Sequence, residues 1–304
     1  EGKEGAMRPP ELLTRDVVAK AIMKEVKEGR GSPHGGAFLD IANRRDPDYI
    51  KKKLPSMYHQ FKELGDLDIT DEPMEVGPTT HYMMGGIRVN AETGESTLNG
   101  MYAAGEAAAG LHGANRLGGN SLSDLLVFGN ITGRAAANYA LKCEEKFLDK
   151  NKLKEAVKEI LEPFSEDKTE NPYVLHQELQ DIMEEHAGIV REEESLGKGI
   201  KKLKELEARV EMARATGDRQ YNPSWHLCLD MKNMIITSLA VAEAARERRE
   251  SRGGHTRLDF PDYDEKLGLV NIIIRKGPDG INIVKSDKKI MPEDLKGFVM
   301  KEAV

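Results

Sequence analysis

Apolar residues recur at helical spacing through the second half of the chain. From 144 to about 250 they fall three or four positions apart, and lysine and glutamate fill the positions between them. This pattern predicts helices near 151–162, 172–190, 195–217 and 231–250. A break is expected at Asn222-Pro223-Ser224-Trp225. Since each helix has one apolar face, we expect an antiparallel bundle of three or more helices.

Shorter elements are predicted on both sides of this bundle. The pattern indicates a helix over 14–29 with Thr14 as its N-cap, and a helical stretch near 47–64 inside the turn-rich segment 33–75. Three further elements are expected, namely a buried strand at Met101–Ala104, a helix from about Ser121 to Cys143 capped by Asn120, Ser121 or Ser123, and a terminal hairpin formed by Leu269–Arg275 and Ile281–Val284. The mixture of elements predicts an α+β, multidomain fold, and a chain of 304 residues is long enough for more than one domain.

Composition excludes several classes of function. The 45 basic and 52 acidic side chains are interspersed and give a net charge of −7, which argues against a nucleic-acid-binding protein. No apolar run reaches the length of about 18 residues that a membrane span needs, and no signal peptide is visible. Cys143 and Cys228 have no metal-ligand spacing, so we predict two reduced thiols and no metal site. These features favour a cytoplasmic protein.

The densest chemistry lies between His81 and Leu126. Four glycines, Gly110, Gly113, Gly118 and Gly119, surround His112, Asn115 and Arg116. Such glycines let a backbone approach a ligand closely, but the spacing matches neither the phosphate-loop nor the dinucleotide fingerprint. The predicted helix begins directly after this loop, and a helix N-terminus favours negative charge. The segment therefore has the residue types needed to hold a dianionic substrate against a flat cofactor.

Two charged residues outside this loop have two interpretations each. Glu106 follows the predicted strand directly, which is a common position for a carboxylate that binds a ribose, although a surface acid is the simpler interpretation. Arg15 is expected in the first turn of a helix, where the macrodipole disfavours a cation by roughly 0.3–1 kcal/mol. It is either a solvated side chain or part of an anion site. His176 and His186 are expected to be surface or packing residues.

Four blocks of sequence resemble a known family. They are TRDVVAKAIMKEVKEGRG (14–31), HYMMGGI (81–87), YAAGEAAAGLHGANRLGGNSL (102–122) and ESRGGHTRLDFPDYD (250–264). Together and in this order they resemble the flavoprotein subunit of succinate dehydrogenase and fumarate reductase. The four blocks span most of the chain, so the resemblance is far more specific than any single glycine motif.

The resemblance implies roles for individual residues. Arg15 matches the arginine that gives a proton to one carbon of fumarate while a hydride passes between the flavin and the other carbon. His81 and Arg116 match residues that bind the substrate carboxylates, and a planar guanidinium suits such a bidentate contact. Glu106 matches the carboxylate on the ribose of FAD, and Asn120, Ser121 and Leu122 match the segment against the isoalloxazine ring. His112 and His255 lie in matching blocks without an assigned role.

The resemblance also implies a division of the chain and a set of partners. We expect the remainder of a capping domain at 1–76, the returning segment of an FAD-binding domain at 77–143, a helical bundle domain at 144–256 and a C-terminal extension at 257–304. The N-terminal FAD-binding half of the family is missing, so we expect weak FAD binding and no turnover from this chain alone. An iron–sulfur subunit is the expected electron-transport partner. Such partner proteins would also hold the chain at the inner face of the cell membrane.

Two alternatives remain open at this point. L-aspartate oxidase shares the capping-domain arginine and an ESRG-type block, although the wording HYMMGG and NRLGGNSL fits the dehydrogenase and reductase better. Adenylylsulfate reductase resembles the chain only distantly. A non-catalytic module that docks onto another protein of a complex is the alternative outside enzymes. The sequence leaves open the physiological direction, the electron carrier and whether the flavin is covalent.

Overall fold

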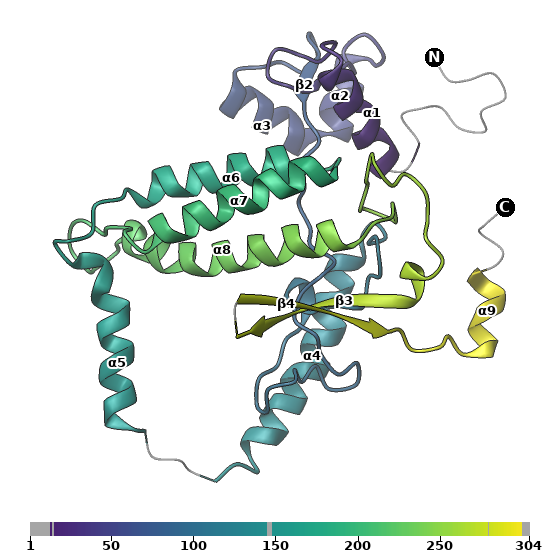
Figure 1. Cartoon of the computed structure of the whole chain (residues 1–304). Helices are drawn as coiled ribbons and strands as arrows, with labels where there is room; N and C mark the ends of the chain where they lie inside the picture. The colour runs from purple at the N-terminus through teal and green to yellow at the C-terminus, as the bar shows by residue number, and fades with distance from the viewer. Residues whose placement is uncertain (1–12, 14, 145–147, 279, 300–304) are drawn as a thin grey trace. The chain divides into compact units, whose positions relative to one another are not determined.

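The structure, a computed structural model, describes residues 13, 15–144, 148–278 and 280–299. The chain divides into two compact units, Glu1–Tyr82 and Met83–Val304, which we call the first and the second unit and describe separately. Helices and short antiparallel strands occur in both (Figure 1). The mixture confirms the expected α+β multidomain class. The finer division at 76, 143 and 256 stays a prediction.

The first unit is a small helical unit with one two-stranded sheet. Its elements are α1 (Arg15–Lys27), β1 (Ala37–Leu39), α2 (Pro47–Lys53), α3 (Pro55–Gly65) and β2 (Met74–Val76), and β1 pairs antiparallel with β2. The predicted stretch at 47–64 is two helices, because Pro55 cannot continue α2 and instead opens α3 at its first position. Thr14, the predicted cap of α1, lies outside the described residues.

The core of the first unit is small. Ile50, Ile69 and Met74 are its buried members. Hydrogen bonds from Ser32 and then from His34 hold the carboxylate of Glu75 on β2 and lower its pKa to about 2. A local polar contact therefore adds to a limited apolar core.

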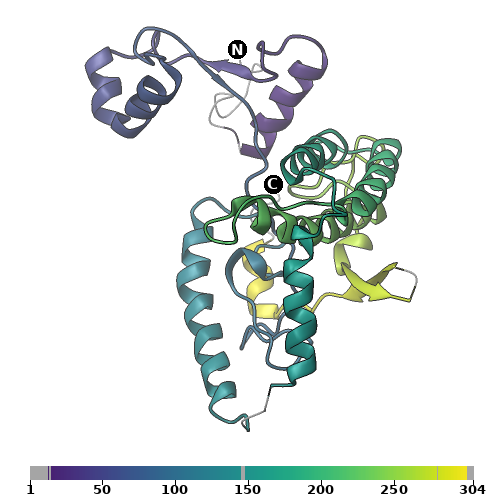
Figure 2. The same ribbon diagram turned by 90° about the vertical axis from the view of Figure 1, so that its left-hand side faces the viewer.

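The second unit contains the bundle and the segments that precede and follow it. Its elements are η2 (Gly105–Ala107), α4 (Asn120–Ala140), α5 (Lys150–Leu161), η3 (Glu162–Phe164), α6 (Pro172–Ala187), α7 (Glu193–Val210), α8 (Pro223–Glu247), η4 (Leu267–Leu269), β3 (Val270–Gly277), β4 (Gly280–Asp287) and α9 (Glu293–Val299). Helices α6, α7 and α8 lie side by side in Figure 1, and Figure 2 shows the same group from its end. The predicted bundle is thus present.

The bundle is held by one continuous apolar core. Fully or almost fully buried side chains from all three helices meet there, among them Leu175, Leu203, Leu206, Met231 and Ile235. At roughly 1.5–3 kcal/mol for each fully buried aliphatic side chain, this core is the main apolar contribution to the second unit.

The helix ends of the bundle differ from the prediction in two places. Helix α8 begins at Pro223 and not near 231, because Asn222 accepts a hydrogen bond from the Trp225 N–H (3.0 Å) and Pro223 occupies the first helical position. Helix α7 ends at Val210, short of 217. The intervening turn is fixed by the Asn222 amide, which donates to the carbonyl of Thr216 (2.8 Å) and so closes the loop between the helices.

The terminal hairpin is confirmed and is longer than predicted. Strands β3 and β4 pair antiparallel from Val270 opposite Asp287 to Gly277 opposite Gly280. The prediction of a strand at Met101–Ala104 is wrong. This segment forms only an isolated bridge between Tyr102 and Glu95, and the Met101 carbonyl accepts from the Ser96 N–H (2.8 Å). Local turn contacts therefore take the backbone groups that a neighbouring strand would bind.

A buried arginine joins the end of the bundle to the following loop. Arg257 is 0% exposed and donates to the carbonyls of Ala245 (3.0 Å) and Arg246 (3.1 Å) near the end of α8. Its guanidinium also pairs with Asp259 (2.7 Å) and Glu193 (3.2 Å), the first residue of α7. One side chain thus connects the C-terminus of α8, the N-terminus of α7 and the loop after the bundle.

We expect Arg257→Met to destabilise the chain by about 2–4 kcal/mol, because two carbonyls and two partly exposed carboxylates lose their shared, fully buried donor. The measurement is urea unfolding followed by circular dichroism. Arg209→Met is the matched control, since this arginine also pairs with two carboxylates, Glu170 and Glu178, but is 40% exposed. Its loss should be below about 1 kcal/mol. Equal losses in the two variants would contradict the assignment of Arg257.

Candidate functional site

The glycine loop and the start of α4 leave backbone groups open to a ligand. Gly119 has φ of +84° and precedes Asn120, the first residue of α4. No side chain caps this helix in the described part of the chain, so the caps predicted at Asn120, Ser121 or Ser123 are wrong. All three of these residues lie inside the helix, and the N-cap position is Gly119, which has no side chain. The Asn120 N–H donates to the Leu117 carbonyl (3.2 Å), and the other first-turn N–H groups are available to an anion.

The glycines of this loop have open space where a side chain would stand. A Cβ built on Gly110, Gly113, Gly118 or Gly119 would have no heavy atom within 4 Å in the described structure. Asn120 and Leu122 at the helix start are exposed, and Ser121 is half-buried. A flat ligand can therefore approach this backbone closely, which is what the motif requires of a cofactor surface.

Arg116 lies in the same loop. Its side chain is half-buried, its Nε is buried, and its Nη1 donates to the carbonyl of Leu117 (3.2 Å). A guanidinium that is partly desolvated binds a carboxylate more strongly than one that is fully hydrated, because less water is displaced and the local dielectric is lower.

A histidine fixes this loop to α4. His112 Nε2 lies 3.2 Å from Asp124 Oδ2, and both side chains are almost fully buried. The pair joins the loop to the second turn of α4. The glycines between His112 and α4 therefore lie in a segment that is attached at both ends. Sequence reasoning missed Asp124, for which the only local signal is its position four residues after Asn120 on the same helix.

Glu106 lies in η2 and is engaged with the neighbouring segment. Its Oε1 accepts from the Met83 N–H at 2.8 Å, and the side chain is exposed. Ile87 runs beside the same turn, since its N–H donates to the Ala107 carbonyl (2.8 Å) and its carbonyl accepts from the Ala109 N–H (2.9 Å). A carboxylate has about four acceptor positions, so this contact leaves capacity for a ribose hydroxyl.

The two remaining predicted residues belong to the first unit. Arg15 is the first residue of α1 and is exposed. His81 is exposed near the end of this unit, with Nδ1 3.4 Å from the Thr79 carbonyl oxygen. Glu106, Arg116 and the start of α4 thus all lie in the second unit, within one continuous segment of the chain. The meeting of Arg15 and His81 with Arg116 stays a prediction.

His255 is held in one neutral form by two neighbours. Arg191 Nη1 lies 3.0 Å from Nδ1, and the Arg248 carbonyl oxygen lies 2.9 Å from Nε2. A guanidinium only donates and a carbonyl only accepts, so Nδ1 must accept and Nε2 must carry the proton. Burial, followed by the charges of Arg191, Arg257 and Arg248, outweighs the Arg248 hydrogen bond and lowers the pKa of His255 to about 4.

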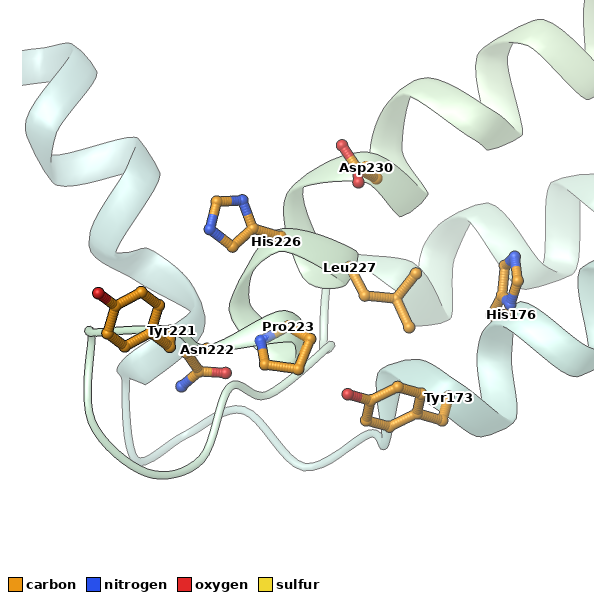
Figure 3. Close-up of a pocket in the computed structure, with 8 residues that line it drawn as sticks. All are labelled: Tyr173, His176, Tyr221, Asn222, Pro223, His226, Leu227 and Asp230. Carbon is orange, nitrogen blue, oxygen red and sulfur yellow. The ribbon is translucent and has the colours of Figure 1, made fainter.

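The bundle surface has two hollows that share His176 and Asp230. Figure 3 shows the first, between α6 and α8, lined also by Tyr173, Tyr221 and His226. None of the predicted site residues lines either hollow. His186 is a packing residue as expected, since it is buried, its Nδ1 lies 2.9 Å from Ser195 Oγ, and burial lowers its pKa.

Membrane spans and metal clusters are absent from the part of the chain that the structure describes. No helix within it is both long and apolar enough to span a membrane. No group of three or more histidine, cysteine, aspartate or glutamate side chains within residues 13, 15–144, 148–278 and 280–299 has a metal-binding arrangement.

Two family models match the chain. Residues 3–122 match the FAD binding domain, and residues 176–291 match the fumarate reductase flavoprotein C-term. Both matches place the chain in the class of FAD-binding flavoproteins. The glycine loop and the open α4 start fit that cofactor, because both present backbone and not side chains.

Similar proteins and solved structures indicate which family within this class the chain resembles. One component of the fumarate reductase (CoM/CoB) of Methanothermobacter marburgensis is 39% identical over 83% of this chain and 45% of its own length. The succinate dehydrogenase flavoprotein subunit of Coxiella burnetii is 36% identical over 86% of this chain and 47% of its own. The solved Mycobacterium smegmatis Sdh1 in complex with UQ1 has a TM-score of 0.85 and 46% identity, and the match covers 96% of this chain and 50% of that one. This chain belongs to the family of succinate dehydrogenase and fumarate reductase flavoprotein subunits.

The chain spans about half the length of these relatives, with 45% of the first and 47% of the second covered. The activity, substrates and partners of a whole protein are therefore treated below as proposals.

The lowered pKa of the half-buried His255 predicts a pH dependence of stability. Its folded pKa of about 4 lies below the ordinary value near 6.5, so between these pH values the unfolded chain binds a proton that the folded chain does not. Stability contributed by this histidine is present above about pH 6.5 and is lost as the pH falls through 4. The carboxylates Glu250 and Asp259, whose pKa values are lowered, lose stability in the same direction.

We expect His255→Gln to remove the histidine part of this dependence, because an amide can donate to Arg248 and accept from Arg191 without titrating. Denaturant unfolding of both proteins from pH 7 to 4 should show the free-energy difference changing in favour of the variant by roughly 1–3 kcal/mol. The carboxylates are present in both proteins and cancel. A difference that is constant with pH would show that folding leaves the pKa of His255 unchanged.

Proposed function

We propose that this chain supplies the substrate arginine and one wall of the flavin site of an enzyme that interconverts succinate and fumarate. The observation that carries the proposal is the position of Arg116. This residue is half-buried, lies four residues before the first residue of α4, which has no side-chain cap, and is close in sequence to glycines that face open space. Anion binding and close cofactor approach are then available in one short segment. The family match supports FAD as the cofactor.

The chain's own residues divide the work as follows in this proposal. Arg116 binds one substrate carboxylate through its planar guanidinium, and His81 binds the substrate as a second polar contact. Glu106 accepts a hydrogen bond from the ribose of the cofactor, and the backbone of Asn120, Ser121 and Leu122 lies against the ring. FAD, when bound, accepts or delivers the hydride.

Arg15 is the proposed proton donor. An arginine is normally always protonated and is therefore a poor acid toward water. The carbon that remains after hydride delivery is a much stronger base than water, so a guanidinium N–H can protonate it. Arg15 is the first residue of α1, so in this proposal the helix N-terminus also attracts the dianion, which offsets the unfavourable position of the cation.

Partners and location follow the same proposal. The relatives are named as parts of larger enzymes, and we propose that electrons pass to or from an iron–sulfur subunit in an electron-transport complex. The protein would lie on the cytoplasmic side and reach the membrane only through such partners. A place in the tricarboxylic acid cycle belongs to this proposal as well.

The first test is Arg116→Ala in the flavin-loaded enzyme that contains this chain. We expect kcat/KM for fumarate to fall on the order of a hundredfold to a thousandfold, because a preorganised charged donor is lost at the substrate. The assay follows oxidation of a reduced viologen dye. Arg134→Ala is the control, since Arg134 is an exposed arginine on the same helix α4. Its turnover should be unchanged.

Two results would contradict the proposal. Near-normal fumarate kinetics in Arg116→Ala would remove the substrate role and favour a chain that serves only for docking. Turnover of aspartate in preference to succinate by the unchanged enzyme would favour an L-aspartate oxidase.

A flavin titration tests the cofactor surface separately. We expect the 304-residue chain alone to quench FAD fluorescence only weakly, because the sequence has no dinucleotide fingerprint and the match covers about half of each relative. Tight, saturable binding would show that residues 81–126 form a cofactor site unaided, and Glu106→Gln should then weaken it measurably.

A further inference from the structure

A tight turn at Arg252–His255 contacts the loop that carries Arg116. The turn is closed by two backbone hydrogen bonds, from Arg252 N–H to the His255 carbonyl (2.8 Å) and from His255 N–H to the Arg252 carbonyl (3.0 Å). At its tip the Gly254 N–H donates to the Ala114 carbonyl at 2.9 Å. Ala114 is two residues before Arg116, so a fixed Ala114 limits where the guanidinium can lie.

The contact at this tip leaves no room for a side chain. Gly253 has φ of +58°, and a Cβ there would lie 2.3 Å from the Ala114 carbonyl oxygen and 2.6 Å from its carbonyl carbon. A Cβ on Gly254 would lie 3.1 Å from the Met84 side chain. The backbone of the turn thus contacts the backbone at Ala114 directly, and only residues without a side chain allow this close approach.

The turn itself is held from behind by buried charge. Glu250 is 0% exposed and accepts from Arg252 Nε with both of its oxygens (3.0 Å each), from Arg248 Nη1 (2.6 Å) and from the Asp264 N–H (3.0 Å). On the other side of the turn His255 is fixed by Arg191 and by the Arg248 carbonyl. The tip therefore has little freedom to move away from Ala114.

We propose that the Gly253-Gly254 turn is a positioning element for Arg116, which sets the guanidinium in its substrate-binding place through the Ala114 backbone. The element joins the end of the helical bundle to the glycine loop of the candidate site. It acts with the His112–Asp124 pair, which fixes the other side of Ala114 to α4. The kinetic part of this inference rests on the function proposed for Arg116.

The test is Gly253→Ala, with Gly217→Ala as the matched control. Gly217 also has a left-handed φ, of +86°, but a Cβ there meets only the Asn222 side chain at 3.9 Å. Both variants carry the cost of a left-handed alanine, and only the first pushes on Ala114. In the flavin-loaded enzyme Gly253→Ala should raise KM for fumarate about tenfold to a hundredfold, while reduction of the flavin by dithionite stays normal. Gly217→Ala should change neither.

A second readout separates this inference from the proposed function. Amide hydrogen exchange in the 304-residue chain should be at least about tenfold faster at Gly254 and Asn120 in Gly253→Ala than in Gly217→Ala. The N–H groups of these two residues donate to the carbonyls of Ala114 and Leu117, and loss of the tip contact frees the loop. This result does not depend on any activity. If Arg116→Ala left turnover intact while this exchange effect held, the substrate role would fail and the positioning of the loop would stand.

Arg252→Lys covers the case in which Gly253→Ala does not fold. Lysine keeps the charge but cannot reproduce the two contacts of Arg252 Nε with Glu250 or the Nη2 contact with the Asp264 carbonyl (3.1 Å). It should loosen the turn without inserting an atom at the tip, and raise KM and exchange in the same direction by a smaller factor. Unchanged exchange at Gly254 and Asn120 in every foldable variant of the turn would overturn the inference.

Discussion

The second unit depends on charges buried where the bundle ends. Arg257 and Glu250 are both 0% exposed, and a lone charge at either place would be strongly disfavoured. Each is paired and also hydrogen-bonded to backbone, Arg257 to the end of α8 and Glu250 to the Asp264 N–H. Such a network tolerates only one arrangement of its members, because moving one leaves another unsatisfied. The loop after α8 thus has a defined shape without an apolar core of its own.

That defined shape has a consequence at the glycine loop. A loop rich in glycine gains close approach to a ligand but loses the order that side chains would give. Here order comes from outside the loop, through His112 with Asp124 on one side and Gly254 with Ala114 on the other. The backbone can then stay bare toward a ligand and still hold Arg116 in place.

Much of this architecture could be predicted from the sequence, and the misses have physical reasons. The bundle helices and the terminal hairpin follow from periodicity, whereas periodicity alone merges α2 with α3, because it does not register that Pro55 starts a new helix. The strand at Met101–Ala104 failed because a short apolar run says nothing about which neighbour takes its hydrogen bonds. The Asp124 and Gly253 contacts could not be predicted, since they join residues 12 and 139 positions from their partners His112 and Ala114 with no periodic signal.

Arg15 shows how a residue that is unfavourable in its own helix can point to a ligand-binding role. A cation at the first position of α1 is opposed by the helix dipole, and Asp16, which pairs with Lys20 at 3.9 Å, is an ordinary first-turn acid beside it. Nothing in the first unit's small core requires an arginine at that position. A dianion would reverse the balance, because it attracts the guanidinium and the helix N-terminus together. Under the proposed function, Arg15 is disfavoured in the isolated helix and favoured with a dicarboxylate bound, which is the difference in free energy that a substrate-binding residue contributes.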